Sequence, residues 1–285
     1  MLEKHIQFLR AYAVSIVILF HLNIPFFKNG FLGVDIFFLI SGYVLSKKLK
    51  SEYEKNFSIN FKNFFIKRVK RIYPLLVIVV LVVFSLNVLL GPYHSIPSTL
   101  YEAFFTLFGT SNLYFLFKNH DYFKNELGSP FDHTWSLGVE EQIYFIFHFL
   151  FYFLIKSKKN MILNIIIFTL FLIILRLIFL NFISDVSAFY LPFFRMWEFF
   201  LGCTLAVIGT KKNKLFNFFS FLSLILFTVF IKIENIFLAQ IISLLSLFVF
   251  IYTYENNHKN SFLKIVNANI FVYTGNISYS LYLWH

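Results

Sequence analysis

Apolar residues recur along the chain in runs that are each about as long as one bilayer crossing. Ten such runs lie near residues 6–24, 31–46, 74–91, 101–117, 134–155, 161–182, 189–209, 215–231, 237–254 and 269–285. A helix needs about 20 predominantly apolar residues to span the hydrocarbon core of a membrane. The pattern therefore predicts an all-α fold, a polytopic transmembrane helical bundle.

The run at 101–117 is the most polar of the ten, and the basic residues indicate that it does not cross. Lys and Arg concentrate at 47–71, 156–159, 211–214 and 259–264, and such residues favour the cytoplasmic side of a membrane. These four clusters and Lys4 fall on one side only if 101–117 dips in without crossing. Non-crossing backbone is tolerated where protein buries it. We therefore expect about nine crossing segments, one re-entrant or interfacial segment and a cytoplasmic N-terminus.

Composition favours an integral membrane protein over a soluble one. Of the 285 residues, 59% are hydrophobic and only 14% are charged, whereas soluble domains have about 25% charged residues. The net charge of +11 is typical of cytoplasmic loops that face a membrane. We therefore expect the lipid bilayer, and no nucleic acid, among the partners.

The chain is expected to form a single integral-membrane domain over residues 1–285. The first run carries charged residues and lacks a small-residue cleavage site, so we expect it to be a retained helix rather than a signal peptide. The last run stops at His285 and is too short to span comfortably. We therefore expect the closing helix or helices to be missing.

Two ionisable residues share one face of the first predicted helix. Arg10 and His21 are eleven residues apart, which is about three turns and about 16 Å along the axis. Ionisable groups inside a membrane are costly and mark functional sites, although Arg10 can also reach the headgroups. Asp35 lies about one turn inside the second helix, at a depth close to His21. There it either orients the histidine as a base or stabilises its own helix N-terminus.

A basic motif precedes the third predicted crossing. Arg68 and Arg71 are three residues apart and share a helix face, and Pro74 suits the first position of the crossing. Arginine forks bind phosphate oxygens, so the pair is a candidate anchor for a phosphorylated cytoplasmic ligand. Contacts with anionic lipid headgroups are the alternative.

Two adjacent carboxylates enter the membrane from the outer side. His133 and Trp135 suit the interface, and Glu140 and Glu141 lie about 9–11 Å deeper along a helix than this pair. Successive helical residues point about 100° apart, so we expect one to face a cavity and the other to pair with an arginine such as Arg195. Arg195 also stands three residues before Glu198, and a pair within that helix is an open alternative.

Three loop histidines and the spacing of possible metal ligands point to no further site. His94, His120 and His258 fall in predicted loops, and no role is expected for them. We find no set of His, Cys or carboxylates with metal-ligand spacing.

Taken together and in this order, the motifs resemble the membrane acyltransferase 3 family, and the resemblance spans the whole chain. The matching elements are Arg-x10-His at 10–21, Gly-Val-Asp-Ile-Phe-Phe-Leu-Ile-Ser-Gly-Tyr at 33–43, Arg-x-x-Arg-Ile-x-Pro at 68–74, His-Thr-Trp-Ser-Leu-x-Val-Glu-Glu-Gln-x-Tyr at 133–144, Phe-Arg-x-x-Glu-Phe at 194–199 and Ile-Ser-Tyr-Ser-Leu-Tyr-Leu-Trp-His at 277–285.

The resemblance implies an O-acyltransferase of the bacterial cytoplasmic (inner) membrane. It would move an acetyl group from cytoplasmic acetyl-CoA to a hydroxyl of an extracytoplasmic glycan, a surface polysaccharide such as O-antigen. Acetyl-CoA is then a substrate, and no bound cofactor is expected. Arg10, Arg68 and Arg71 would anchor the phosphates of the acyl donor.

The same resemblance assigns catalytic and supporting roles. His21 would act as general base or as transient acyl carrier, and Asp35 would orient its imidazole. Glu140 is the third catalytic candidate, and Glu140 or Glu141 would position the acceptor from outside. The acceptor-binding or supporting candidates are His133, Ser136, Glu141, Arg195 and Glu198. The competing hypothesis is a transporter or flippase for a glycan precursor, which predicts inverted repeats and interrupted helix pairs. We find neither in the sequence.

Overall fold

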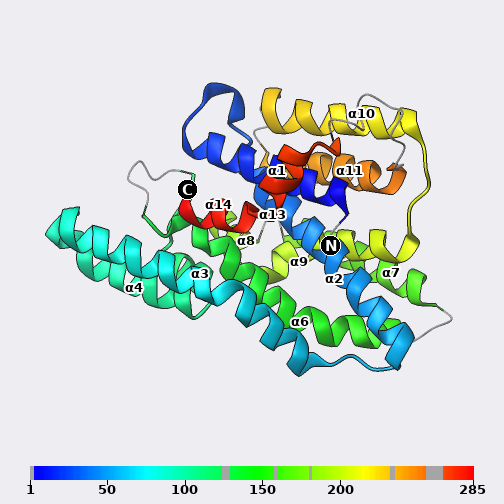
Figure 1. The fold of residues 1–285 in the computed structure, drawn as a ribbon, viewed down its shortest axis with the longest axis horizontal. Coiled ribbons are helices and arrows are strands. Elements are labelled where there is room, and N and C mark those ends of the chain that lie inside the picture. Colours follow the sequence, from blue (N-terminus) through cyan, green and yellow to red (C-terminus); the bar gives the residue numbers. More distant parts are fainter. Residues whose placement is uncertain (1–2, 124–128, 157–159, 180–181, 232–234, 255–265) are drawn as a thin grey trace. The chain divides into compact units, whose positions relative to one another are not determined.

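The computed structural model describes residues 3–123, 129–156, 160–179, 182–231, 235–254 and 266–285. Within these ranges every regular element is a helix (Figure 1), which confirms the predicted all-α fold. The α-helices are α1 (Lys4–His21), α2 (Leu32–Asn56), α3 (Phe61–Leu90), α4 (Ile96–Leu107), α5 (Ser111–Phe117), α6 (Trp135–Lys156), α7 (Met161–Phe179), α8 (Asp185–Tyr190), α9 (Pro192–Ile208), α10 (Lys214–Ile225), α11 (Ile236–Thr253), α13 (Asn269–Asn276) and α14 (Ser278–Trp284). Short 3-10 helices are η1 (Pro25–Phe27), η2 (Tyr93–Ser95) and η3 (Asp132–Thr134), and η4 (Leu226–Phe230) is a π-helix.

Four of the described helical segments are long and apolar enough to cross a bilayer. They are Phe61–Leu90, Asp132–Lys156, Met161–Phe179 and Ile236–Thr253. In the most apolar windows of α3 and α7, mean hydropathy reaches 2.7 and 2.8, yet only 22% of each window is buried. Apolar surface left exposed on this scale is suited to lipid rather than to water. The chain is thus a multi-pass membrane protein, and the expected number of nine crossings stays a prediction.

The run at 101–117 does not form one straight crossing helix. It is divided between α4 and α5, and Gly109 separates them with a φ of +65°, a left-handed conformation that favours glycine. Helices of 12 and 7 residues are about 18 and 10 Å long. Both fall short of the roughly 30 Å hydrocarbon core, as expected for a re-entrant or interfacial segment.

Helix α3 begins earlier than the sequence analysis predicted. Pro74 was expected at the first position of the crossing, but it lies inside a helix of 30 residues. The helix starts after Asn60, whose side chain accepts a hydrogen bond from the backbone N–H of Asn63 at 2.9 Å, the usual action of an N-cap. Proline removes one backbone donor without ending this helix. Arg68 and Arg71 therefore belong to α3 itself rather than to a segment before it.

The helices gather in two compact units. Residues 1–51, 198–283 and 285 form the first, and residues 52–197 and 284 form the second. In the first unit α1 lies beside α13, and α10 lies beside α11 (Figure 1). In the second unit α3 lies beside α4, and α5 beside α6. Of the predicted basic clusters, residues 157–159 and 259–264 lie outside the described residues.

Glycine allows two helices of the first unit to approach closely. A Cβ at Gly42 of α2 would lie 2.0 Å from the carbonyl oxygen of Phe199, and one at Gly202 of α9 would lie 2.0 Å from that of Leu39. No larger residue fits at either position without moving a backbone. Small residues serve this kind of close helix packing in membrane proteins.

Candidate active site

His21 is the last residue of α1, and a backbone hydrogen bond orients its ring. Its Nδ1 lies 2.9 Å from the carbonyl oxygen of Val17. A carbonyl oxygen can only accept, so Nδ1 carries the hydrogen and Nε2 is the basic nitrogen of the neutral ring. The position at a helix C-terminus also favours the positive charge that the ring gains on taking up a proton.

A second histidine contacts this ring from the other end of the chain. His285 Nε2 lies 3.2 Å from His21 Nδ1, and His285 Nδ1 lies 2.6 Å from the carbonyl oxygen of Tyr282. His285 therefore donates to Tyr282 through Nδ1 and offers Nε2 as a second acceptor for the His21 hydrogen. The motif at 277–285 thus contributes directly to the surroundings of His21, a contact that the sequence analysis did not anticipate.

Asp35 lies in the first turn of α2 and is 1% exposed. One of its carboxylate oxygens accepts a hydrogen bond of 2.8 Å from the side-chain amide of Gln240 on α11. Nearby, a Cβ at Gly33 would meet Ala13 and Val17 of α1, so the start of α2 packs against α1. The expected role of Asp35 in orienting His21 stays a prediction, and Gln240 is an additional partner that the sequence did not reveal.

In the second unit, Arg68 binds both of the adjacent carboxylates. Its Nη2 lies 3.5 Å from Glu140, and its Nε lies 3.3 Å from Glu141. The guanidinium also stands over the ring of Tyr144, 3.3 Å from the ring centre, and the Tyr144 hydroxyl donates to Glu140. The three charged side chains are 16–22% exposed.

This cluster corrects two expectations from the sequence. Glu140 and Glu141 were expected to face different partners, but the guanidinium fork has two edges and reaches both. Arg68 was expected in a segment before the third crossing, but α3 begins at Phe61, so Arg68 lies about 10 Å along this helix. There it contacts the two carboxylates of α6. A phosphate would have to compete with two anions for this arginine.

The other donor-anchoring candidates are separate from this cluster. Arg71 is exposed on α3, three residues beyond Arg68, and Arg10 is half-buried on α1 in the first unit. Their predicted contacts with the acyl donor stay predictions.

The acceptor-side candidates are distributed over three elements. His133 lies in η3 and Ser136 in α6, and the Ser136 hydroxyl donates to the His133 carbonyl at 3.3 Å. Arg195 is 3% exposed on α9. Its Nε donates to the Phe189 carbonyl at 3.2 Å, and its guanidinium stands 5.3 Å from the ring centre of Trp135. Glu198, on the same helix, is fully buried; its supporting role stays a prediction.

A polar cluster in the second unit escaped the sequence analysis. His120 Nε2 lies 3.1 Å from an Asp132 oxygen, and the other Asp132 oxygen accepts from the Ser129 backbone N–H at 2.8 Å. The Ser129 hydroxyl donates to Glu102 of α4. The hydrogen bond to Asp132 raises the pKa of His120, and burial raises the pKa of Glu102. The short-range sequence held no signal for this cluster, because its members come from three separate segments.

The described part of the chain contains no group of three or more His, Cys, Asp or Glu residues arranged to hold a metal ion.

Comparison with known proteins identifies relatives along almost the whole chain. A family model described as an acyltransferase domain matches residues 4–285. The peptidoglycan O-acetyltransferase OatA of Listeria monocytogenes is 32% identical over 300 residues, which cover 97% of this chain and 48% of that protein. The O-acetyltransferase OatA of Staphylococcus aureus is 33% identical over 301 residues, covering 97% of this chain and 49% of that protein.

The chain therefore spans about half the length of the curated relatives it matches. No solved structure gives a significant match.

Proposed function

The chain belongs to the membrane acyltransferase 3 family, and from this premise we propose that it is an O-acetyltransferase. In this proposal it moves an acetyl group from cytoplasmic acetyl-CoA to a glycan hydroxyl on the outer side of the membrane. The first unit supplies the base, and the outer ends of its helices face the acceptor.

The observation that carries this proposal is the geometry of His21. Its Nδ1 hydrogen bond to the Val17 carbonyl fixes the ring as the tautomer with a basic Nε2. A general base needs this unprotonated nitrogen directed at the substrate hydroxyl and a surrounding that tolerates the imidazolium. The Val17 contact leaves Nε2 unprotonated, and the helix dipole at the end of α1 favours the imidazolium cation.

In the proposed reaction, His21 Nε2 takes the proton of the acceptor hydroxyl as the oxygen attacks the thioester carbonyl carbon. The tetrahedral intermediate collapses by breaking the carbon–sulfur bond. The departing thiolate takes the proton back from the imidazolium, so the products are an acetyl ester and the free thiol. Asp35 and Gln240, hydrogen-bonded to each other, hold the start of α2 against α11.

The acceptor is proposed by likeness to the relatives. The name of the Listeria relative specifies peptidoglycan, so we favour a peptidoglycan hydroxyl over the O-antigen that the sequence analysis named.

The proposal is tested with the purified protein in liposomes that enclose a peptidoglycan oligosaccharide, with ¹⁴C-acetyl-CoA supplied outside. Protein with its cytoplasmic side outward is expected to produce a labelled, alkali-labile acetyl ester on the enclosed sugar. His21→Ala should abolish the label, whereas His94→Ala, which changes an exposed histidine of η2, should retain it. Passage of the sugar across the membrane without covalent change would instead support the transporter hypothesis.

A further inference from the structure

Lysines from three separate basic stretches line one cavity of the first unit. The cavity has a volume of about 520 Å³, and its walls include Lys4, Lys47 and Lys212. These side chains come from the start of α1, from α2 and from the segment before α10. All three stretches are predicted to be cytoplasmic. The fold therefore gathers at one place positive charges that lie far apart in the sequence.

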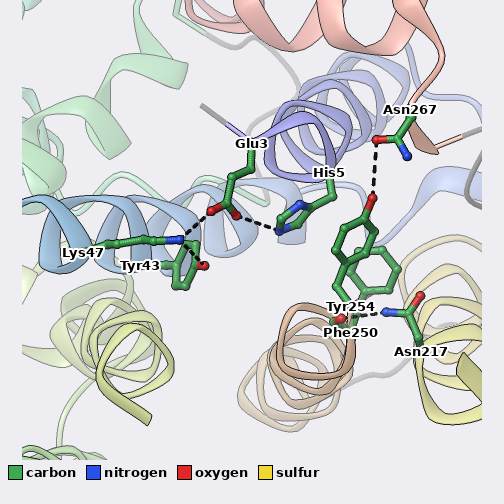
Figure 2. A network of polar contacts seen from close by, with 8 residues as sticks. All are labelled: Glu3, His5, Tyr43, Lys47, Asn217, Phe250, Tyr254 and Asn267. Carbon is green, nitrogen blue, oxygen red and sulfur yellow. Dashed lines mark hydrogen bonds and ion pairs between the residues drawn. The ribbon is translucent and has the colours of Figure 1, made fainter. Parts of the chain in front are cut away.

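A single carboxylate offsets these charges. Among the described residues that line the cavity, Glu3 is the only acid. Figure 2 shows it between Lys47, with which it forms an ion pair, and His5, whose Nε2 lies 3.3 Å from it. The Lys47 side chain remains 54% exposed, so a ligand can reach its ammonium group. Glu3 then acts as an internal competitor for any anion that enters.

Two of the residues that line the cavity, His5 and Tyr254, have stacked aromatic rings. The rings of His5 and Tyr254 stack with centres 4.0 Å apart and planes at 22°. Both residues are buried, and the Tyr254 hydroxyl donates to Asn267 at 3.4 Å (Figure 2). Lys47 in turn donates to the Tyr43 hydroxyl at 3.4 Å. The cavity is therefore a built site with a buried floor and a charged rim, not merely a group of surface lysines.

We propose that this cavity binds the phosphate groups of the cytoplasmic acyl donor, with Lys4, Lys47 and Lys212 as the phosphate ligands. The inference rests on the proposed function and gives the donor a binding site. Ammonium groups bind phosphate as point charges, and three of them line this cavity together with one carboxylate. Arg68, which the sequence assigned to this task, instead faces two carboxylates.

The cavity and the proposed base lie on the same helix. His5 stands sixteen residues before His21 on α1, which corresponds to about 24 Å along the helix axis. A donor whose thioester is carried on a long flexible arm suits this separation: its phosphates remain at the cytoplasmic end while the reacting carbon extends towards His21.

The test is coenzyme A binding to the protein in nanodiscs of phosphatidylcholine, measured by calorimetry. The double variant Lys47→Gln/Lys212→Gln is expected to weaken binding at least about tenfold, the equivalent of about 1.4 kcal/mol. The matched variant Lys48→Gln/Lys211→Gln removes the exposed neighbours of the same two lysines. It should leave the affinity within about twofold of the original.

Glu3→Gln gives a test of opposite sign, because removing the competing carboxylate should tighten coenzyme A binding. Misfolding cannot produce that gain. Unchanged affinity in both the Lys47→Gln/Lys212→Gln and Glu3→Gln variants would overturn the proposal. If Lys47→Gln/Lys212→Gln lost binding to phosphatidylglycerol vesicles but bound coenzyme A unchanged, the proposal would also be overturned. The cavity would then be assigned to lipid headgroups. If the cavity variants bind normally while His21→Ala still abolishes acetyl transfer, the cavity proposal fails and the proposed function stands.

Discussion

Removing the positive charge of Arg68 should destabilise the second unit more than removing the whole charged cluster. Arg68 is the recorded ion-pair partner of both Glu140 and Glu141, at 3.5 and 3.3 Å. Glu140 and Glu141 are adjacent in sequence and largely buried. In Arg68→Gln these two carboxylates would repel each other without the positive charge of the arginine. In the triple variant that also carries Glu140→Gln and Glu141→Gln, no charge is left in the cluster and amide hydrogen bonds remain available.

The magnitude follows from the distances and the burial. At about 3.4 Å and an effective dielectric constant of about 20, each attraction amounts to about 5 kcal/mol before desolvation is subtracted. Breaking a buried ion pair by removing one partner usually costs about 3–5 kcal/mol, whereas replacing all the charges with neutral groups can be nearly neutral. With side chains 16–22% exposed, we expect the lower end, about 3 kcal/mol, for Arg68→Gln. The triple variant should recover most of this loss.

Thermal unfolding of the purified variants in one detergent measures the difference. Arg68→Gln is expected to lower the melting temperature by on the order of 5–10 °C, and the triple variant by clearly less. Arg71→Gln, an exposed arginine on the same helix, is the control and should change it little. A triple variant no more stable than Arg68→Gln would refute the charge-pairing argument, since the loss would then come from lost packing of the arginine.

Three further predictions follow from single contacts. Gly202→Ala should destabilise the first unit by about 1–3 kcal/mol, because its Cβ would overlap a backbone carbonyl of α2; an unchanged melting temperature would contradict the observed helix contact. Gln240→Leu should cost about 1–3 kcal/mol by leaving a buried oxygen of Asp35 without its amide donor, and Asp35→Asn in that background should restore part of the stability. The hydrogen bond to Asp132 raises the pKa of His120. The ion pair between the two therefore contributes its full stability below about pH 6.5, and this contribution is lost as pH rises through the raised pKa. Melting temperatures at pH 6 and pH 9 should therefore differ less in His120→Gln than in the original protein, and an equal difference would count against this ion pair.

The helical architecture was predictable because a bilayer sets the length of apolar runs. The interruption at 101–117 was also predictable. That run is the most polar of the ten, and the basic residues fall on one side of the membrane only if it does not cross. The start of α3 could not be predicted from apolar runs, because its first turns, after Asn60, are rich in polar residues. The helix nevertheless continues from there into the apolar run. Its N-cap was a usable signal: Asn60 precedes a helical pattern and bonds to the backbone N–H of Asn63.

The residue types of the candidate site were predictable, but several of their partners were not. Periodicity reveals which residues share a helix face, and it predicted one face for Arg10 and His21. The expected depth of Asp35, close to that of His21, came from counting residues along the second helix. It carries no information about which distant helices meet. The Asp35–Gln240 bond joins residues 205 positions apart, and the Arg68–Glu141 bond joins residues 73 apart. The expected helix start at Pro74 also put Arg68 outside the helix, whereas it lies within α3 and contacts Glu140 and Glu141.

The most direct test of the central claim is the O-acetyl content of peptidoglycan from cells that express the protein as their only such transferase. It is measured by NMR of the isolated glycan for the original protein, His21→Ala and His94→Ala at matched protein levels. The account predicts acetyl signals with the original protein and with His94→Ala, and none with His21→Ala. Undiminished acetylation with His21→Ala would contradict the assignment of His21 as the catalytic base.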